Sequence, residues 1–72
     1  MNPFKELRKN LGLTMQEVCS MAGVALSTLQ NLEKGVTTNP PAKVLNFYQK
    51  KGIDPERLRK AYAEYLKQVR EV

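Results

Sequence analysis

The sequence is poor in the residues that build metal sites, disulfides and many catalytic centres. It has no histidine, no tryptophan and a single cysteine, Cys19, among 72 residues. One cysteine cannot form an internal disulfide, and no Cys/His cluster offers a metal site. A chain this short buries only about 60% of its unfolded surface. We therefore expect one small domain, without metal ion or cofactor, that is stabilised by packed helices or by a partner chain.

Long apolar runs and catalytic groupings are also missing. No apolar stretch approaches the ~18 residues of a membrane-spanning helix, so we expect a cytoplasmic protein with no membrane partner. Paired carboxylates, an activated nucleophile and a glycine-rich phosphate loop cannot be assembled. Met15, Cys19 and Met21 could suggest soft-metal or redox chemistry, but their spacing favours core filling. An enzyme is not expected.

What the sequence does contain is an excess of positive charge. Twelve Lys and Arg stand against seven Asp and Glu, a net charge of +5. Residues 1–36 carry four basic and three acidic side chains, whereas residues 37–72 carry eight and four. From Asn10 to Leu32 the one charged residue is Glu17. This balance favours a polyanionic partner without separating DNA from RNA or a lipid surface. The middle segment is suited to contacts through neutral polar groups.

Helix-start and helix-stop signals divide the chain into five predicted helices, and no stretch alternates long enough to be a strand. The first helix starts at Asn2-Pro3 and stops at Gly12, and the second starts with a Thr14–Glu17 capping box and stops at Gly23. The third begins after Val24 and stops at Gly35, and the fourth runs from Asn39-Pro40 to Gly52. The fifth starts at Asp54-Pro55 and carries an apolar stripe to Val69. The expected inner positions of the first two helices are Phe4, Leu7, Leu11, Val18, Cys19 and Ala22. Only Gly23-Val24-Ala25 separates the second and third helices, the short turn typical of a helix-turn-helix.

The segment Leu11–Pro40, LGLTMQEVCSMAGVALSTLQNLEKGVTTNP, resembles the lambda repressor, Cro and XRE family of phage and bacterial regulators. The matching features are Gly-Leu-Thr at 12–14, the Ala-Gly-Val turn at 22–24, Ser-Thr-Leu at 27–29 and Glu-Lys-Gly at 33–35. The likeness continues more loosely to about Leu58. It implies an all-α, five-helix, lambda-repressor-like domain over residues 1–58, with the helix-turn-helix at about 14–34 and double-stranded DNA as partner.

The resemblance also implies which residues read DNA from the third helix, at 25–34. A helical wheel places Ser27, Asn31 and Lys34 opposite Leu29, Leu32 and Glu33, with Leu26 and Gln30 at the edge. Amide side chains can pair with adenine, serine with several bases, and leucine with a thymine methyl group. The expected base-contacting residues are Leu26, Ser27, Gln30 and Asn31. The alternative is ordinary solvation or, for Leu26, packing or a contact with a partner.

Phosphate contacts are expected beside this helix. The amides near Met15 and Gln16 open the second helix, and the loop at 37–39 leads into the fourth, which gives two anion sites. The expected phosphate-contacting residues are Gln16, Lys34, Thr37, Thr38, Asn39 and Lys43. Two positions depart from the family pattern. Met15 stands where glutamine is common, so it receives no DNA role and Gln16 partly substitutes. Ala25 stands where a Ser or Thr cap is common.

The resemblance implies an ion pair between Arg8 and Glu33. The wheel turns Glu33 toward the core side of the third helix, where an unpaired carboxylate would be costly. The alternative is that both charges are solvated on the surface.

The fifth helix, predicted within residues 54–72, carries more apolar residues than closure of the domain requires. Ile53 and Leu58 would suffice for that, but the stripe continues through Tyr62, Tyr65, Leu66 and Val69. The helix either folds back over its own domain or packs against a second chain. A two-fold dimer would present two reading helices about one DNA turn apart, ~34 Å, and this favours a homodimer through that stripe.

Together these features predict a sequence-specific transcriptional regulator that reads an operator in the major groove. The setting expected from the resemblance is a repressor of a phage or mobile element, or a bacterial XRE-type regulator. The same scaffold can instead be a protein-binding module, such as an antitoxin or anti-repressor. Sparse charge around the motif leaves that alternative open.

Overall fold

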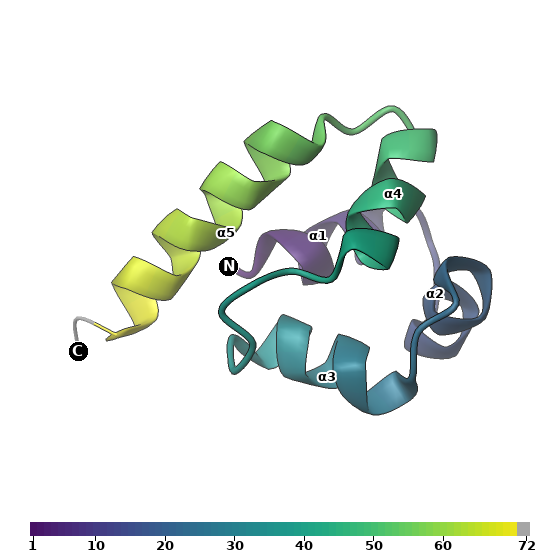
Figure 1. The fold of residues 1–72 in the computed structure, drawn as a ribbon, viewed down its shortest axis with the longest axis horizontal. Helices are drawn as coiled ribbons and strands as arrows, with labels where there is room; N and C mark the ends of the chain where they lie inside the picture. The colour runs from purple at the N-terminus through teal and green to yellow at the C-terminus, as the bar shows by residue number, and fades with distance from the viewer. Residues whose placement is uncertain (71–72) are drawn as a thin grey trace.

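The computed structural model describes residues 1–70, which form five helices and no strand (Figure 1). The helices are α1 (Pro3–Asn10), α2 (Met15–Ala22), α3 (Leu26–Lys34), α4 (Ala42–Lys50) and α5 (Pro55–Arg70). The prediction of an all-α, five-helix fold is confirmed. The predicted C-terminal range 54–72 ends at two residues that lie outside the described part of the chain.

Local capping explains where the first helices begin and end. The side chain of Asn2 accepts hydrogen bonds from the amides of Phe4 and Lys5 at the start of α1. Thr14 and Glu17 form the predicted capping box at the start of α2, because each side chain bonds the other residue's backbone amide. Gly23 ends α2 in the left-handed conformation, with φ 77°, that glycine adopts most easily.

The start of α4 differs from the prediction by two residues. The helix was expected to open at Asn39-Pro40, but it begins at Ala42, after Pro41 as the cap residue. The physical reason is the double proline: a residue that precedes proline is disfavoured in the helical region, and Pro40 precedes Pro41. The loop between α3 and α4 is therefore longer than the sequence pattern suggested.

The core lies where the five helices meet. The rings of Phe4 and Tyr62 pack edge to face with their centroids 5.1 Å apart, and Phe4 also lies 6.1 Å from Tyr48. Around these rings lie the other buried apolar side chains: Val18, Cys19, Leu29, Leu32, Val44, Leu45, Phe47, Leu58 and Leu66. Two expected core residues are not part of it. Leu11 follows the last residue of α1 and is exposed, and Met21 is half exposed on α2.

Helix α5 folds back over its own domain, packing against α1 and α4 (Figure 1). Tyr62 is 1% exposed and Leu66 is 8% exposed, so both are core residues of this chain. Their inclusion in the expected dimer stripe is corrected by this burial, because a side chain covered by its own core has no surface left for a second chain. Tyr65 is half buried and Val69 is exposed. The dimer itself stays a prediction.

Candidate nucleic-acid interface

Helices α2 and α3 and the three residues between them form a tight helix-turn-helix unit. The amides of Gly23 and Val24 both donate to the carbonyl of Cys19, at 2.9 and 3.1 Å, which closes the end of α2. The thiol of Cys19 lies 3.7 Å from the carbonyl of Ala25 and is buried between the two helices. Burial raises the pKa of the Cys19 thiol, and the nearby Glu33 carboxylate adds to the rise. This cysteine is therefore a packing residue, as its spacing suggested.

The inner face of α3 is anchored to the rest of the domain by apolar burial and by hydrogen bonds at its last turn. Leu29 and Leu32 are fully buried. The amide of Asn2 donates to the carbonyls of Leu32 and Glu33, both at 2.9 Å. The hydroxyl of Tyr62 also reaches the Leu32 carbonyl, at 3.2 Å. The Leu32 carbonyl also accepts from the amide of Gly35 at 3.2 Å, so these side chains add to the backbone bonding at the end of α3 and fix the rotation of the helix.

Arg8 on α1 and Glu33 on α3 form a shielded ion pair. Nε of Arg8 donates to Oε2 of Glu33 at 2.9 Å, and Nη2 donates to Oε1 at 3.0 Å, which is the two-pronged geometry that guanidinium and carboxylate favour. The side chains are 12% and 2% exposed. The hydrogen bond to Glu33 raises the pKa of Arg8 above its ordinary value. Since Glu33 is the one carboxylate in α3, its negative charge is neutralised away from the opposite face.

The opposite face of α3 is polar and open. Ser27, Asn31 and Lys34 are exposed on it, and Leu26 is exposed at the start of the helix. Gln30 is half buried, so less of its side chain is presented to solvent. Ala25 precedes the helix without a side-chain cap, as expected from the departure at that position. This face offers hydroxyl, amide and ammonium groups with no carboxylate beside them.

The residues expected to contact phosphate lie in three places. Gln16 is exposed in the first turn of α2, where backbone amides still lack intrahelical partners. Thr38 and Asn39 are exposed in the loop before α4, while Thr37 is half buried there, with its carbonyl bonded to the hydroxyl of Tyr62. Lys34 is exposed at the end of α3.

Lys43, the remaining expected phosphate contact, has a local partner. Its ammonium donates to the carbonyl of Gly23 at 3.4 Å, beside the C-terminal end of α2. A cation there complements the negative end of the helix dipole. The side chain is exposed, so this bond does not hold it away from solvent.

A family model described as a helix-turn-helix domain matches residues 2–71. The chain belongs to this helix-turn-helix family. The match covers nearly the whole chain, α5 included, and it is consistent with the resemblance to Cro- and XRE-type regulators read from residues 11–40. It points to a DNA-binding regulator. No curated protein and no solved structure matched the chain in the corresponding searches.

Within this helix-turn-helix domain, sequence reasoning missed what Asn2 and Tyr62 do for the reading helix. Asn2 was recognised as the cap of α1, but its amide also ties α1 to the end of α3. Tyr62 was assigned to a dimer surface, yet its hydroxyl lies against the carbonyls of Leu32 and Thr37. These partners are 25 to 31 residues away along the chain, so no local spacing signals them.

Two further observations concern the described residues only. None of their helices is both long enough and apolar enough to cross a membrane. Residues 1–70 also hold no group of three or more His, Cys, Asp and Glu side chains placed to bind a metal ion.

Proposed function

We propose that this protein is a transcriptional regulator that binds an operator sequence and reads its major groove with α3. The expected base contacts are Ser27 and Asn31, with Leu26 at the start of the helix and Gln30 as a lesser contributor. The proposed biological role is repression, by occupying promoter DNA of a phage, a mobile element or a bacterial chromosome. With DNA as its partner, the protein would act in the cytoplasm.

The observation that carries this proposal is the division of α3 into two faces. Leu29, Leu32 and the neutralised Glu33 hold one face against the domain. The other presents Ser27, Asn31 and Lys34 to solvent. Amide and hydroxyl groups on an anchored helix are the groups that distinguish base pairs in the major groove. If the outer face of α3 were only solvated, nothing would require Glu33, the one carboxylate of the helix, to be bound on the inner face.

Phosphate contacts would set the position of α3 in the groove. Gln16 and the first amides of α2 would hold one backbone segment, and Thr38 and Asn39 another, with Lys34 adding charge. In Figure 1, α2 lies by the first turn of α3, and the loop begins at its last turn. Contacts at both ends of the reading helix support a defined register. Lys43 would contribute less if it keeps its bond to Gly23.

The test is a binding titration of the intact chain on random duplex DNA at several salt concentrations, followed by selection of bound sequences from a random pool. A DNA-binding regulator loses affinity steeply as salt rises, because bound cations are released from the duplex. It also enriches a defined sequence. A chain whose weak binding is insensitive to salt, or which enriches no sequence, is not an operator-binding regulator. Such a result would favour the protein-binding alternative, an antitoxin or anti-repressor.

A further inference from the structure

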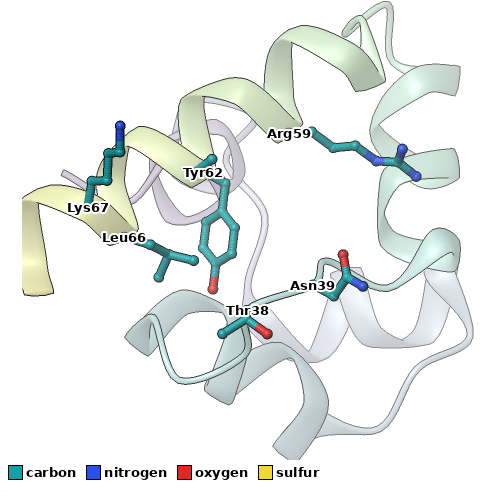
Figure 2. Close-up of a pocket in the computed structure, with 7 residues that line it drawn as sticks. Thr38, Asn39, Arg59, Tyr62, Leu66 and Lys67 are labelled. Carbon is teal, nitrogen blue, oxygen red and sulfur yellow. The ribbon is translucent and has the colours of Figure 1, made fainter.

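A cavity of about 480 Å³ lies between α5 and the loop at residues 35–41, next to the proposed DNA surface. Its polar border includes Thr38 and Asn39 from the loop and Arg59 from α5 (Figure 2). Figure 2 shows Lys67, which also borders the cavity, directing its ammonium group away from it. Among the residues that the structure describes, no acidic one lines this space.

Two of the residues that line the cavity are also core residues of the domain. Tyr62 and Leu66 form its floor and are 1% and 8% exposed, so little of their apolar surface remains for the side chain of a partner protein. The polar groups at its border include an amide, a hydroxyl and a guanidinium, and Figure 2 shows the Arg59 side chain extending from α5 toward α4. All three can donate hydrogen bonds, and the guanidinium carries a full positive charge. This set suits an anion with several acceptor oxygens, such as a phosphate.

A hydrogen bond joins α5 to the loop that carries Thr38 and Asn39. The hydroxyl of Tyr62 on α5 is bonded to the carbonyl of Thr37, the residue before Thr38. The position of Asn39 relative to Arg59 is therefore set by the fold rather than by a free loop. Among the side chains described, those of residues 1–69, the one ion pair is Arg8–Glu33, so Arg59 forms none, and the nearest carboxylate along α5 is Glu56, which borders a second cavity with Arg59. An exposed arginine that forms no ion pair and borders a cavity with an anchored polar loop is suited to binding an anion.

We infer that Arg59 completes a phosphate-binding site with Thr38 and Asn39, so that α5 takes part directly in holding the DNA backbone. This inference rests on the proposed function. The loop leaves the last turn of α3, so the phosphate held there flanks the groove that α3 reads. The contact is independent of base identity and strengthens binding to every duplex.

The chain supplies a matched control for this inference. Arg57 lies two residues before Arg59 on α5, but it borders a different cavity, with Pro3, Glu6 and Leu7 of α1; each arginine thus shares a cavity with one glutamate, Glu6 for Arg57 and Glu56 for Arg59. Both arginines are exposed, so neither substitution removes a core side chain. R59Q and R57Q remove the same charge from the same helix. A general electrostatic effect would change both alike, whereas a direct phosphate contact would change only R59Q.

The experiment compares the intact chain, R59Q and R57Q on a selected sequence and on random duplex DNA over a range of salt concentrations. We expect R59Q to weaken binding roughly 3- to 10-fold on both DNAs and to reduce the slope of log affinity against log salt by about 1. R57Q should retain the affinity and slope of the intact chain. Equal effects of the two substitutions overturn the inference and leave the proposed function standing.

Uncharged methylphosphonate placed at single positions of the selected duplex locates the contact. The intact chain should lose affinity at one phosphate outside the bases read by α3; R59Q should be indifferent to that same replacement, and Asn39→Ala, which keeps the arginine, should be less sensitive to it than the intact chain. If R59Q stays sensitive at every position, Arg59 holds no phosphate and the inference fails. If R59Q binds DNA normally but alters self-association, the cavity belongs to a second copy. If the intact chain shows no salt-dependent binding, the proposed function fails as well.

Discussion

Arg8 and Glu33, 25 residues apart, are joined by two hydrogen bonds of 2.9 and 3.0 Å that connect α1 to the reading helix. The Nη1 atom of Arg8 also donates to the carbonyl of Leu13 at 3.0 Å, which links the pair to the segment before α2. Because Glu33 is almost fully buried, its carboxylate depends on Arg8 for compensation. The pair thus contributes both to stability and to the placement of α3.

Arg8→Met or Glu33→Met alone should lower the free energy of unfolding by about 2–4 kcal/mol, because each leaves a shielded charge without its partner. The double substitution should cost less than the sum of the two. Urea unfolding of the four chains of this double-mutant cycle measures the coupling. Small and additive losses would mean that both charges are effectively solvated.

Gly35→Ala should destabilise the protein more than Gly12→Ala. Both glycines have positive φ, 80° and 70°, so an added Cβ strains the backbone at each position by about 1–2 kcal/mol. At Gly35 the Cβ would also stand 3.3 Å from the ring of Tyr65 and 3.5 Å from Leu66, whereas nothing lies within 4 Å at Gly12. Thermal unfolding of the two variants measures the difference. Equal losses of stability in the two variants would show that α5 moves away from the added Cβ at Gly35 without a further loss of stability.

Tyr48 should make stability fall at alkaline pH. Burial, helped by the Glu33 carboxylate, raises the pKa of Tyr48 to about 12, and an unfolded tyrosine ionises near pH ~10. The folded state holds this proton more tightly, so the contribution of Tyr48 is complete below about pH 10 and is lost as pH rises toward about 12.

The control for this decline is Tyr48→Phe, which has no proton to lose. It also lacks the hydroxyl that donates to the Phe4 carbonyl at 3.3 Å, so it should start about 1 kcal/mol lower at neutral pH. Urea unfolding from neutral pH to about pH 12 should then show a shallower alkaline decline for Tyr48→Phe than for the intact chain. If the stability of both proteins falls in parallel with pH, the alkaline decline is caused by titratable groups other than Tyr48.

Asn31→Ala and Lys34→Ala should distinguish base recognition from the sequence-independent electrostatic attraction to DNA. Asn31 is exposed in the middle of the polar face, and its loss should cost about 1–3 kcal/mol on the selected sequence but little on random DNA. Lys34 contributes charge without base selectivity, so its loss should weaken both about equally. Competition binding with the two duplexes measures each ratio. If Asn31→Ala keeps the preference for the selected sequence, the assigned reading face is wrong.

Local chemistry made much of the fold predictable from the sequence. The Thr14–Glu17 capping box, the glycine ends of the helices and the short turn at 23–25 act within a few residues, and the structure contains all three. The start of α4 was placed two residues early because the mutual effect of Pro40 and Pro41 was not weighed.

What could not be predicted depends on contacts between distant segments. Helical periodicity identified Tyr62 and Leu66 as apolar, but it does not tell which surface an apolar stripe meets, and both prove to be part of this chain's own core. The two bonds from Asn2 to the end of α3 likewise need the folded arrangement of α1 and α3. The polar face of α3 was accessible to a helical wheel because it depends on the rotation of one helix alone.

Burial of Tyr62 and Leu66 changes where a homodimer would form. Among the described residues, the apolar side chains left at this end of the molecule include Val69, 48% exposed, the half-buried Tyr65, Val36, 65% exposed, and Met1, 87% exposed, which borders a cavity with Tyr65. They belong to one region, because Gly35, the neighbour of Val36, approaches the Tyr65 ring, and Val69 follows Tyr65 by one helical turn. These few side chains offer far less area than the roughly 800 Å² per partner of a stable interface. Association should therefore be weak in free solution and strengthened when two chains bind adjacent half-sites.

Val69→Glu should remove this association without unfolding the domain, because the side chain is exposed. Gln68→Glu introduces the same charge at the neighbouring exposed position and is the matched control. Leu66→Glu is unsuitable, since a buried carboxylate would disrupt the core. Sedimentation equilibrium, alone and with an operator of two half-sites, should show two intact chains per DNA and reduced cooperativity for Val69→Glu only. An intact chain that stays monomeric at high micromolar concentration and binds the two half-sites independently would contradict the dimer, because the apolar region would then bring no second copy to the DNA.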